Sequence, residues 1–265
     1  MGRLVGSGRS SISITFSVWK ALFLRESLQR LFGARAEWLW LMLEPMIHML
    51  FFVFLYAVVR VRVIGGIDTS IWILLGMVGF FMYRRTGSQG MNSIAPNRPL
   101  FAYRQVKPVD AVLVRAGLEG LLMFIVGCVL FVGMGLAGYP VIPGDPGEVL
   151  LAFFGLWLLG LGFGLTASVL KELVPELGKI IQLFMTPLYF LSGAMFPIAT
   201  LSKSYRELMM LNPVAHGLEA LRSGFSPYYQ AVPELSLPYL FGFALVNLVL
   251  GLALHVRFST KLASL

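Results

Sequence analysis

VLLAFFGLWLLGLGFGLTASVL, residues 149–170, is a stretch without a single charged side chain. A helix rises about 1.5 Å per residue, so roughly 20 apolar residues cross a hydrocarbon core of about 30 Å. This stretch therefore predicts a membrane-spanning helix. The whole chain has the same character, because 57% of its 265 residues are hydrophobic and 13% are charged. Soluble proteins have about 45–50% apolar and about 25% charged residues, so lipid is the expected solvent.

Further apolar runs lie on both sides of this stretch. They predict five more spans, at about 38–59, from about Ile71, and at about 112–138, 178–196 and 237–256. The expected fold is an all-α membrane domain of six transmembrane helices over residues 37–265.

Residues 1–36 form the expected cytoplasmic tail and a helix that precedes the first span. Between residues 12 and 35, Ile14, Val18 and Leu22 alternate with Lys20 and other basic residues. This pattern predicts an amphipathic helix that lies along the membrane surface. An ordinary solvated helix is the alternative.

The distribution of Lys and Arg predicts the orientation, since cytoplasmic loops hold the excess. Six lie in 1–36, six in 84–115, and four more are Lys171, Lys179, Arg257 and Lys261, which makes sixteen of 21. The other side holds five, namely Arg60, Arg62, Lys203, Arg206 and Arg222. Both termini are therefore expected in the cytoplasm. Anionic lipid headgroups explain the net charge of +8 more simply than nucleic acid does.

The segment at about 195–236 is too polar for one span and too long for a tight turn. We expect short re-entrant helices that enter the membrane from outside and pack against protein, with a helical hairpin on the external surface as the alternative. A polar stripe at three-residue spacing follows Asn212 and Pro213, and consists of His216, Glu219 and Arg222. These five residues are candidates for an external gate, and simple helix stabilisation is the other interpretation.

Several enzyme and cofactor motifs are absent from the sequence. There is no G-x-x-x-x-G-K-[ST] phosphate loop, no H-E-x-x-H zinc motif and no G-x-S-x-G nucleophile elbow. The only cysteine, Cys128, excludes a cysteine-based metal cluster within the chain. We therefore expect a chain that is not an enzyme and that binds no cofactor or metal itself. The glycines at 160, 162 and 164 suit close helix packing.

Three motifs stand out along the chain, namely LEP at 43–45, NRPLFAYRQVKPVD at 97–110 and LNPVAHGLEALRSG at 211–224. Together they resemble ABC-2-type permeases, and among them the capsular polysaccharide export permeases of Gram-negative bacteria. They occur in the same order along the chain as in that family. The resemblance implies the ABC-2, or type V exporter, fold and a location in the bacterial inner membrane. It also implies export of an acidic, lipid-linked polysaccharide.

The resemblance also implies a homodimer with two copies of a cytoplasmic ATP-binding subunit, which would hold ATP and Mg²⁺, and with a periplasmic adaptor and an outer-membrane exporter. It implies that a loop at about 93–110 couples the spans to the ATP-binding subunit. The loop at 171–177 is a second expected contact. The coupling residues are expected to be Asn97, Arg98, Leu100, Phe101, Arg104, Lys107 and Pro108.

Arg84 and Arg85 are the leading candidates for the conduit wall. They lie about 20 Å into a span that starts near Ile71, and a charge at that depth normally faces a cavity or a partner. Snorkelling from the end of a shorter span is the alternative. Sugars stack on aromatic rings, and Glu44 and His48 share one helix face. The other conduit candidates are therefore Trp38, Trp40, Phe80, Tyr83, Glu44 and His48.

Three alternatives remain for the function. An ABC-2 permease could carry another surface glycan, such as O antigen or teichoic acid, or a drug. An ion-coupled secondary transporter would need several intramembrane ionisable residues and inverted repeats, which are not evident. A lipid-modifying membrane enzyme lacks the acidic motifs it would require. Copurification with an ATP-binding subunit distinguishes these classes.

Overall fold

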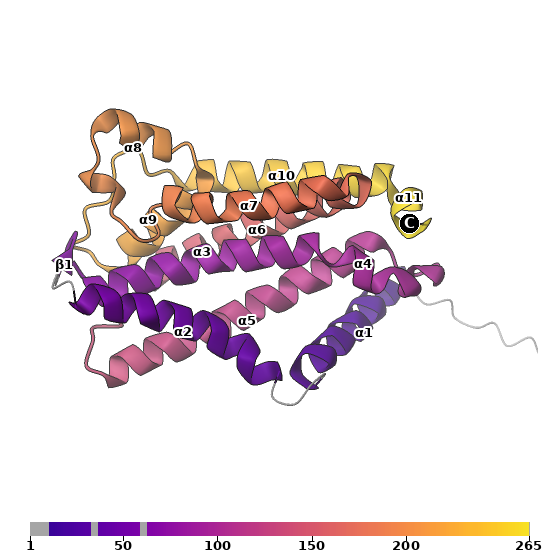
Figure 1. Cartoon of the computed structure of the whole chain (residues 1–265), viewed down its shortest axis with the longest axis horizontal. Helices are drawn as coiled ribbons and strands as arrows, with labels where there is room; N and C mark the ends of the chain where they lie inside the picture. The colour runs from indigo at the N-terminus through magenta and orange to yellow at the C-terminus, as the bar shows by residue number, and fades with distance from the viewer. Residues whose placement is uncertain (1–10, 33–36, 59–62, 265) are drawn as a thin grey trace, which may run out of the picture.

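The computed structural model describes the backbone of residues 11–32, 37–58 and 63–264, and the side chains there except those at 11, 30–32, 37–42, 44, 45 and 56–58. Long helices run back and forth along one axis and form a single bundle (Figure 1). They are α2 (Glu37–Val58), α3 (Thr69–Met91), α5 (Pro108–Leu136), α6 (Pro146–Leu173), α7 (Pro175–Leu191) and α10 (Leu237–Arg257).

Each predicted span corresponds to one of these helices. Within the described residues, α5, α6 and α10 are long and apolar enough to cross a membrane. The helix α7 ends at Leu191, five residues before the predicted end of its span, because Gly193 adopts the left-handed conformation with φ of 68°. A helical membrane bundle is therefore confirmed.

Proline and short polar side chains set the beginnings of the helices. Proline stands in the first turn of α5, α6, α7, α9 and α10, where its missing N–H costs no intrahelical hydrogen bond. Asp68, Asp145 and Asn212 cap α3, α6 and α9 by accepting a backbone N–H near the start of each helix. These caps explain why the helices begin a few residues before the apolar runs do.

The centre of the bundle is α3, which is buried along most of its length and packs against α2, α5, α6 and α9. Glycines on α6 permit this packing. A Cβ at Gly160 would lie 2.7 Å from the Tyr83 carbonyl oxygen on α3, and one at Gly162 would lie 2.8 Å from the Leu248 nitrogen on α10. The predicted packing role of these glycines is confirmed.

One end of the bundle, which we call the α4 end, carries four short or peripheral helices (Figure 1). They are α1 (Ser11–Phe32), α4 (Ile94–Asn97), the 3₁₀ helix η1 (Arg98–Ala102) and α11 (Ser259–Ser264). The C-terminus lies there too. The predicted helix at 12–35 thus corresponds to α1, and the predicted coupling loop is folded as α4 and η1.

The opposite end, which we call the α9 end, carries η2 (Ile198–Thr200), α8 (Lys203–Met209) and α9 (Pro213–Phe225). It also carries a small hairpin of β1 (Val63–Ile64) and β2 (Ile67–Asp68), which the sequence reading did not predict. Gly65 and Gly66 form its turn with φ of 58° and 89°, as a tight hairpin requires. The helix α9 packs on α3, α6 and α10, whereas most of α8 is exposed.

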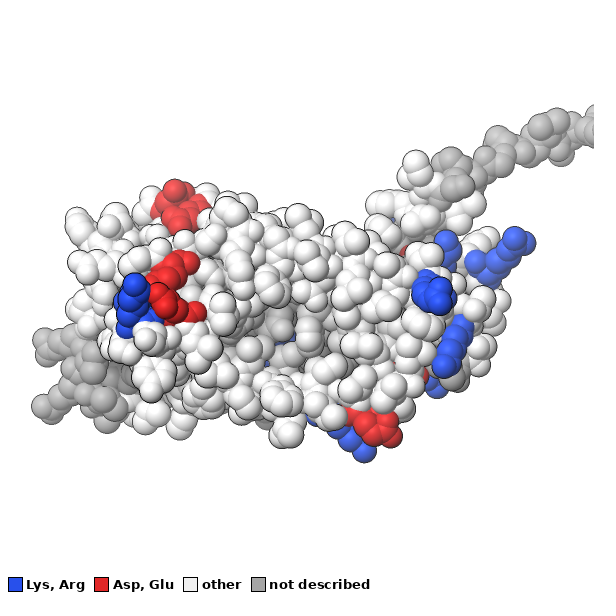
Figure 2. All heavy atoms as spheres, turned by 90° about the horizontal axis from the view of Figure 1, so that it is seen from above, with Lys and Arg blue, Asp and Glu red and all other residues white. Residues whose placement is uncertain are grey.

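Charged side chains are concentrated near the two ends of the bundle on the face shown in Figure 2. The surface between the ends is almost entirely uncharged in this view. An uncharged belt between two charged ends is what a hydrocarbon core requires, since exposed charges are costly there.

Candidate functional site

The coupling segment, residues 93–110 at the α4 end, separates into an exposed tip and buried anchors. The anchors are Ile94, Asn97, Phe101 and Pro108, and the tip comprises Pro99, Ala102, Tyr103, Arg104, Gln105 and Lys107. Leu100 is half-buried. The predicted coupling residues therefore divide between two tasks, because the anchors hold the segment on the bundle while the tip faces outward.

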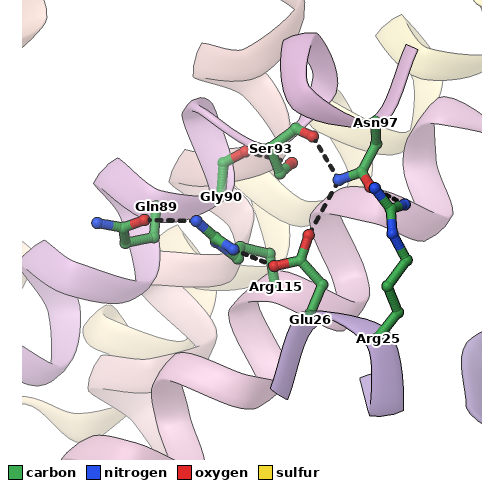
Figure 3. A network of polar contacts seen from close by, with 7 residues as sticks. All are labelled: Arg25, Glu26, Gln89, Gly90, Ser93, Asn97 and Arg115. Atoms are coloured by element: carbon green, nitrogen blue, oxygen red, sulfur yellow. Dashed lines mark hydrogen bonds and ion pairs between the residues drawn. The ribbon is translucent and has the colours of Figure 1, made fainter. Parts of the chain in front are cut away.

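The carboxylate of Glu26 on α1 joins the coupling segment to two long helices (Figure 3). One oxygen accepts a hydrogen bond of 3.1 Å from the Asn97 side-chain amide, and the other forms an ion pair with Arg115 on α5. Arg115 also donates to Gln89 on α3, over 3.1 Å. Glu26 is 6% exposed, so these bonds replace lost water contacts. One polar network thus links α1 to α3, α4 and α5.

The orientation of the Asn97 amide follows from its contacts. Its nitrogen donates to Glu26 and to the Ser93 carbonyl oxygen at 2.9 Å, so its oxygen is free to accept from Arg25 at 3.1 Å (Figure 3). Arg25 comes from the same helix as Glu26. Consequently α1 is joined to the end of α4 by two adjacent side chains.

A second carboxylate, that of Asp110, also joins α1 to the coupling segment. Asp110 caps the first turn of α5 by accepting from the Lys107 backbone N–H at 2.9 Å, and its other oxygen accepts from the Trp19 indole on α1 at 2.7 Å. Because α1 is fixed at Trp19, Arg25 and Glu26, it is a structural part of the coupling region.

The expected loop at 171–177 is almost entirely helical, because α6 continues to Leu173 and α7 begins at Pro175. The last turn of α6 nevertheless touches the coupling segment and its start, since Glu172 forms an ion pair with Arg98 and Lys171 donates to the side-chain oxygen of Asn92. The two loops that were predicted to contact an ATP-binding subunit are therefore adjacent at the α4 end.

A polar seam between α3 and α5 lies deeper in the bundle. Arg85 donates to Glu119 over 3.3 Å, and Glu119 has no exposed surface. Arg84, next to it, lies over the Phe81 ring at 5.9 Å from the ring centre. Both arginines lie about 22–24 Å along α3 from its first residue, at the usual helical rise.

The other conduit candidates differ in exposure. Phe80 has no exposed surface, Tyr83 is 6% exposed, and both pack among aromatic side chains of the same chain. His48 is exposed and its ring lies against Phe52 and Phe81. The side chains of Trp38, Trp40 and Glu44 lie outside the described residues.

At the α9 end, Glu219 and Arg222 on α9 form an ion pair of 3.1 Å in which neither side chain is exposed. Arg222 also donates to the Ala194 carbonyl oxygen at 3.1 Å, and its guanidinium carbon lies 3.5 Å from the centre of the Trp72 ring. The Tyr229 hydroxyl donates to Glu219 at 2.9 Å. Burial raises the pKa of Tyr229 to about 12, so its phenol is protonated at neutral pH and available as a donor.

The remaining gate candidates complete this cluster. The His216 ring accepts from the Ser236 backbone N–H at 3.0 Å through Nδ1, so Nε2 is the protonated nitrogen and donates to the Met210 carbonyl oxygen at 2.7 Å. Asn212 donates to Ser192 at 2.9 Å, and Pro213 begins α9. The structure therefore brings all five gate candidates to one helix that is inserted into the bundle.

A further ion pair lies at the surface of the α9 end. Arg206 on α8 donates to both oxygens of Glu234, at 3.0 and 2.8 Å. This hydrogen bonding lowers the pKa of Glu234 below its usual value and raises that of Arg206. The pair joins α8 to the loop that leads into α10.

Sequence reasoning missed Glu26, Arg115, Glu119 and Tyr229. Arg115 and Glu119 were detectable, because they are charges near the start of an otherwise apolar run at 112–138. Tyr229 carried no comparable signal. Among the described residues, no group of three or more His, Cys, Asp or Glu side chains is arranged to hold a metal ion.

Comparisons with known proteins agree with this architecture. The family model described as ABC-2 type transporter matches residues 17–226. The polysialic acid transport protein KpsM of Escherichia coli is 33% identical over 247 residues, which cover 93% of this chain and 95% of that protein.

Two other relatives are the capsule polysaccharide export inner-membrane proteins CtrC of Neisseria meningitidis serogroup A and BexB of Haemophilus influenzae. They are 27% and 25% identical, and each match covers at least 94% of both chains. The helical bundle, the family match over most of its length and this end-to-end similarity establish that the chain belongs to the ABC-2 type transporter family.

Proposed function

We propose that this chain is the permease subunit of an ATP-driven exporter that moves lipid-linked, acidic capsular polysaccharide across the bacterial inner membrane. The similarity to a polysialic acid transport protein over 93% of the chain is the main support for the substrate class. Two capsule polysaccharide export proteins of the inner membrane also match over almost their full length.

In the proposed topology, the six long helices are six spans and both termini lie in the cytoplasm. The alternating direction of the helices and the location of α1 and α11 at one end support this topology (Figure 1). The excess of Lys and Arg in the segments predicted on that side is consistent with it. Residues 1–36 are then the tail and the interface helix, and 37–265 are the transmembrane domain.

The proposed assembly contains two copies of this chain and two copies of a cytoplasmic ATP-binding subunit. That subunit supplies the ATP and Mg²⁺ site, since this chain has no phosphate-loop sequence. A periplasmic adaptor and an outer-membrane exporter complete the path. Exposed Tyr103, Arg104 and Lys107 form the docking surface for the ATP-binding subunit.

The polar network at the α4 end connects the docking surface to the spans, so it can transmit movements of the ATP-binding subunit to them. Movement of the docked tip reaches α1 through Asn97 and Glu26, and reaches α5 through Arg115. Rigid anchors are needed for this, because a loosely held loop would move without displacing the spans. The observation that carries the proposal is therefore the combination of an exposed basic tip with a base that is held by the hydrogen bonds and the ion pair of Asn97, Glu26 and Arg115.

Arg84 is the proposed contact for the acidic polymer on the conduit side. Its neighbour Arg85 is paired with Glu119, whereas the guanidinium of Arg84 lies over a phenyl ring. We expect Arg84 to meet a phosphate or a sugar acid, and the α9 cluster around Glu219 and Arg222 to act as the external seal.

The test uses the chain coexpressed with its ATP-binding subunit. Arg104→Glu reverses a charge on the tip, and Lys203→Glu reverses an exposed charge at the opposite end as the matched control. We expect Arg104→Glu to reduce both the copurified ATP-binding subunit and the surface polysaccharide, while Lys203→Glu leaves both unchanged. Equal recovery of subunit and polysaccharide in both variants would contradict the proposal.

A further inference from the structure

A groove of about 420 Å³ lies between α1 and the coupling segment. Its walls are apolar on both sides, with Val18 and Leu22 from α1 facing Leu100 and Val106 from the segment. Gln105 and Arg25 are its main polar lining residues. An apolar trough with a single cation suits an amphipathic ligand that carries one negative charge.

The charge of Arg25 is not neutralised within the described part of the chain. Its only partner there is the neutral Asn97 amide, whose orientation is fixed by Glu26 and the Ser93 carbonyl oxygen. By contrast, the neighbouring Arg98 and Arg115 each form an ion pair with a glutamate. Arg25 is therefore held in a defined position with its positive charge available to an anion (Figure 3).

The outer surface of α1 indicates where that anion comes from. Ile12, Phe16 and Leu28 are 82%, 68% and 56% exposed, which places large apolar side chains outside the protein core. A helix with exposed apolar residues beside basic ones is typical of the membrane interface. In the proposed topology this interface is the cytoplasmic one, where anionic headgroups are attracted to basic residues.

We propose that the groove binds an acidic phospholipid of the inner leaflet, with its phosphate on Arg25 and an acyl chain along Val18, Leu22, Leu100 and Val106. The bound lipid would contact α1 and the coupling segment together, and so would stabilise their docked arrangement. A segment of the ATP-binding subunit is a poorer occupant, because most of the groove lining is apolar and the groove lies beside the exposed apolar side chains of α1. The proposal rests on the proposed topology but not on the identity of the exported polymer.

The test measures lipid binding by native mass spectrometry of the purified full-length chain, titrated with phosphatidylglycerol or phosphatidylcholine. We expect the wild type to prefer phosphatidylglycerol. Arg25→Gln is expected to weaken phosphatidylglycerol binding about fivefold, the value of roughly one charge at a membrane surface, and Arg25→Lys to retain most of it. Lys203→Gln, which removes an exposed cation on α8 far from the groove, is expected to leave binding unchanged.

A second pair of variants tests the groove without touching Arg25. Ala21→Trp fills the groove from α1, whereas Leu24→Trp places the same bulk on an exposed position outside it. Only Ala21→Trp is expected to lower lipid binding.

Three results would overturn the proposal. They are equal binding of the two lipids by the wild type, unchanged phosphatidylglycerol binding in both Arg25→Gln and Ala21→Trp, and crosslinking of Ala21→Cys to the ATP-binding subunit rather than to lipid. Binding is measured without export or ATP hydrolysis, so a failure of the proposed transport function would leave this test intact.

Discussion

The two ends of the bundle both bury ion pairs, but they distribute them differently. At the α9 end, Glu219 and Arg222 lie three residues apart on one helix and have no exposed surface. At the α4 end, Glu26 and Arg115 lie 89 residues apart on different helices and retain partial exposure. The first arrangement lies within one helix, which suits the seal proposed there. The second joins separate helices near the surface, which suits the proposed transmission of force.

The largest effect is expected at the α9 end. Arg222→Leu leaves the Glu219 carboxylate buried without its cation, and loss of one partner of a buried pair costs about 3–5 kcal/mol. Thermal unfolding in detergent should show a large fall in stability. The matched control is Lys203→Leu, because its pair with Glu207 is exposed and such pairs contribute about 0–1 kcal/mol. Similar losses in the two variants would remove the distinction between a sealed pair and a surface pair.

A smaller loss of stability but a larger loss of coupling is expected at the α4 end. Arg115→Gln weakens the contact with Glu26, and hydrogen bonds to charged groups contribute about 1.5–3 kcal/mol. The complex should still bind its ATP-binding subunit but export less polysaccharide for each ATP hydrolysed. Lys203→Gln, which breaks an exposed pair with Glu207 at the opposite end, is the control and should leave export per ATP unchanged. Unchanged export per ATP in Arg115→Gln would show that the network does not transmit force.

A third comparison concerns the space around two glycines, Gly76 and Gly117, when each is replaced by alanine. A Cβ at Gly76 would overlap the Ala194 carbonyl oxygen and the Arg222 guanidinium, whereas one at Gly117 meets nothing within 4 Å. Gly76→Ala is therefore expected to cost about 1–3 kcal/mol by overpacking. Gly117→Ala, on α5, should be neutral or slightly stabilising, since alanine favours helices. Equal melting temperatures of the two variants would contradict the packing of α3 against the α9 cluster.

The smallest effect is expected from pH at the Arg206–Glu234 pair of the α9 end. The pKa of Glu234 is lowered in the folded chain by hydrogen bonding to Arg206, so the pair stabilises the fold above the unfolded pKa of about 4.3. That contribution is lost as pH falls through the lower folded pKa. Wild type and Glu234→Gln should thus differ in melting temperature at pH 7 and converge once the pH falls below the lowered folded pKa of Glu234. A difference that grows on acidification would have the wrong sign.

Apolar length and proline placement made most of the helices predictable. Each apolar run corresponds to a helix, and Pro108, Pro146 and Pro213 lie close to the points where helices begin. The pair Glu219–Arg222 was also visible, because a spacing of three places two side chains on one helix face. The role of Glu26 was not visible, since nothing local in the sequence relates α1 to α5 across 89 residues.

The exposure of individual side chains could not be predicted from the sequence either. Phe80 and Tyr83 look like conduit aromatics by composition, yet α3 is central and buries both. Which face of an apolar helix meets lipid, protein or a conduit depends on tertiary packing, because all its faces are apolar. The hairpin at Gly65 and Gly66 was missed because its strands have two residues each, too few to show alternation.

The most direct test of the account locates the tip of the coupling segment. Tyr103 is 67% exposed, so Tyr103→Cys in a Cys128→Ala background places one accessible thiol on the tip. The account predicts labelling by a membrane-impermeant maleimide only after the cytoplasmic face is opened, and a crosslink to the ATP-binding subunit. Labelling of the thiol from outside intact cells would contradict the proposed topology and the coupling mechanism together.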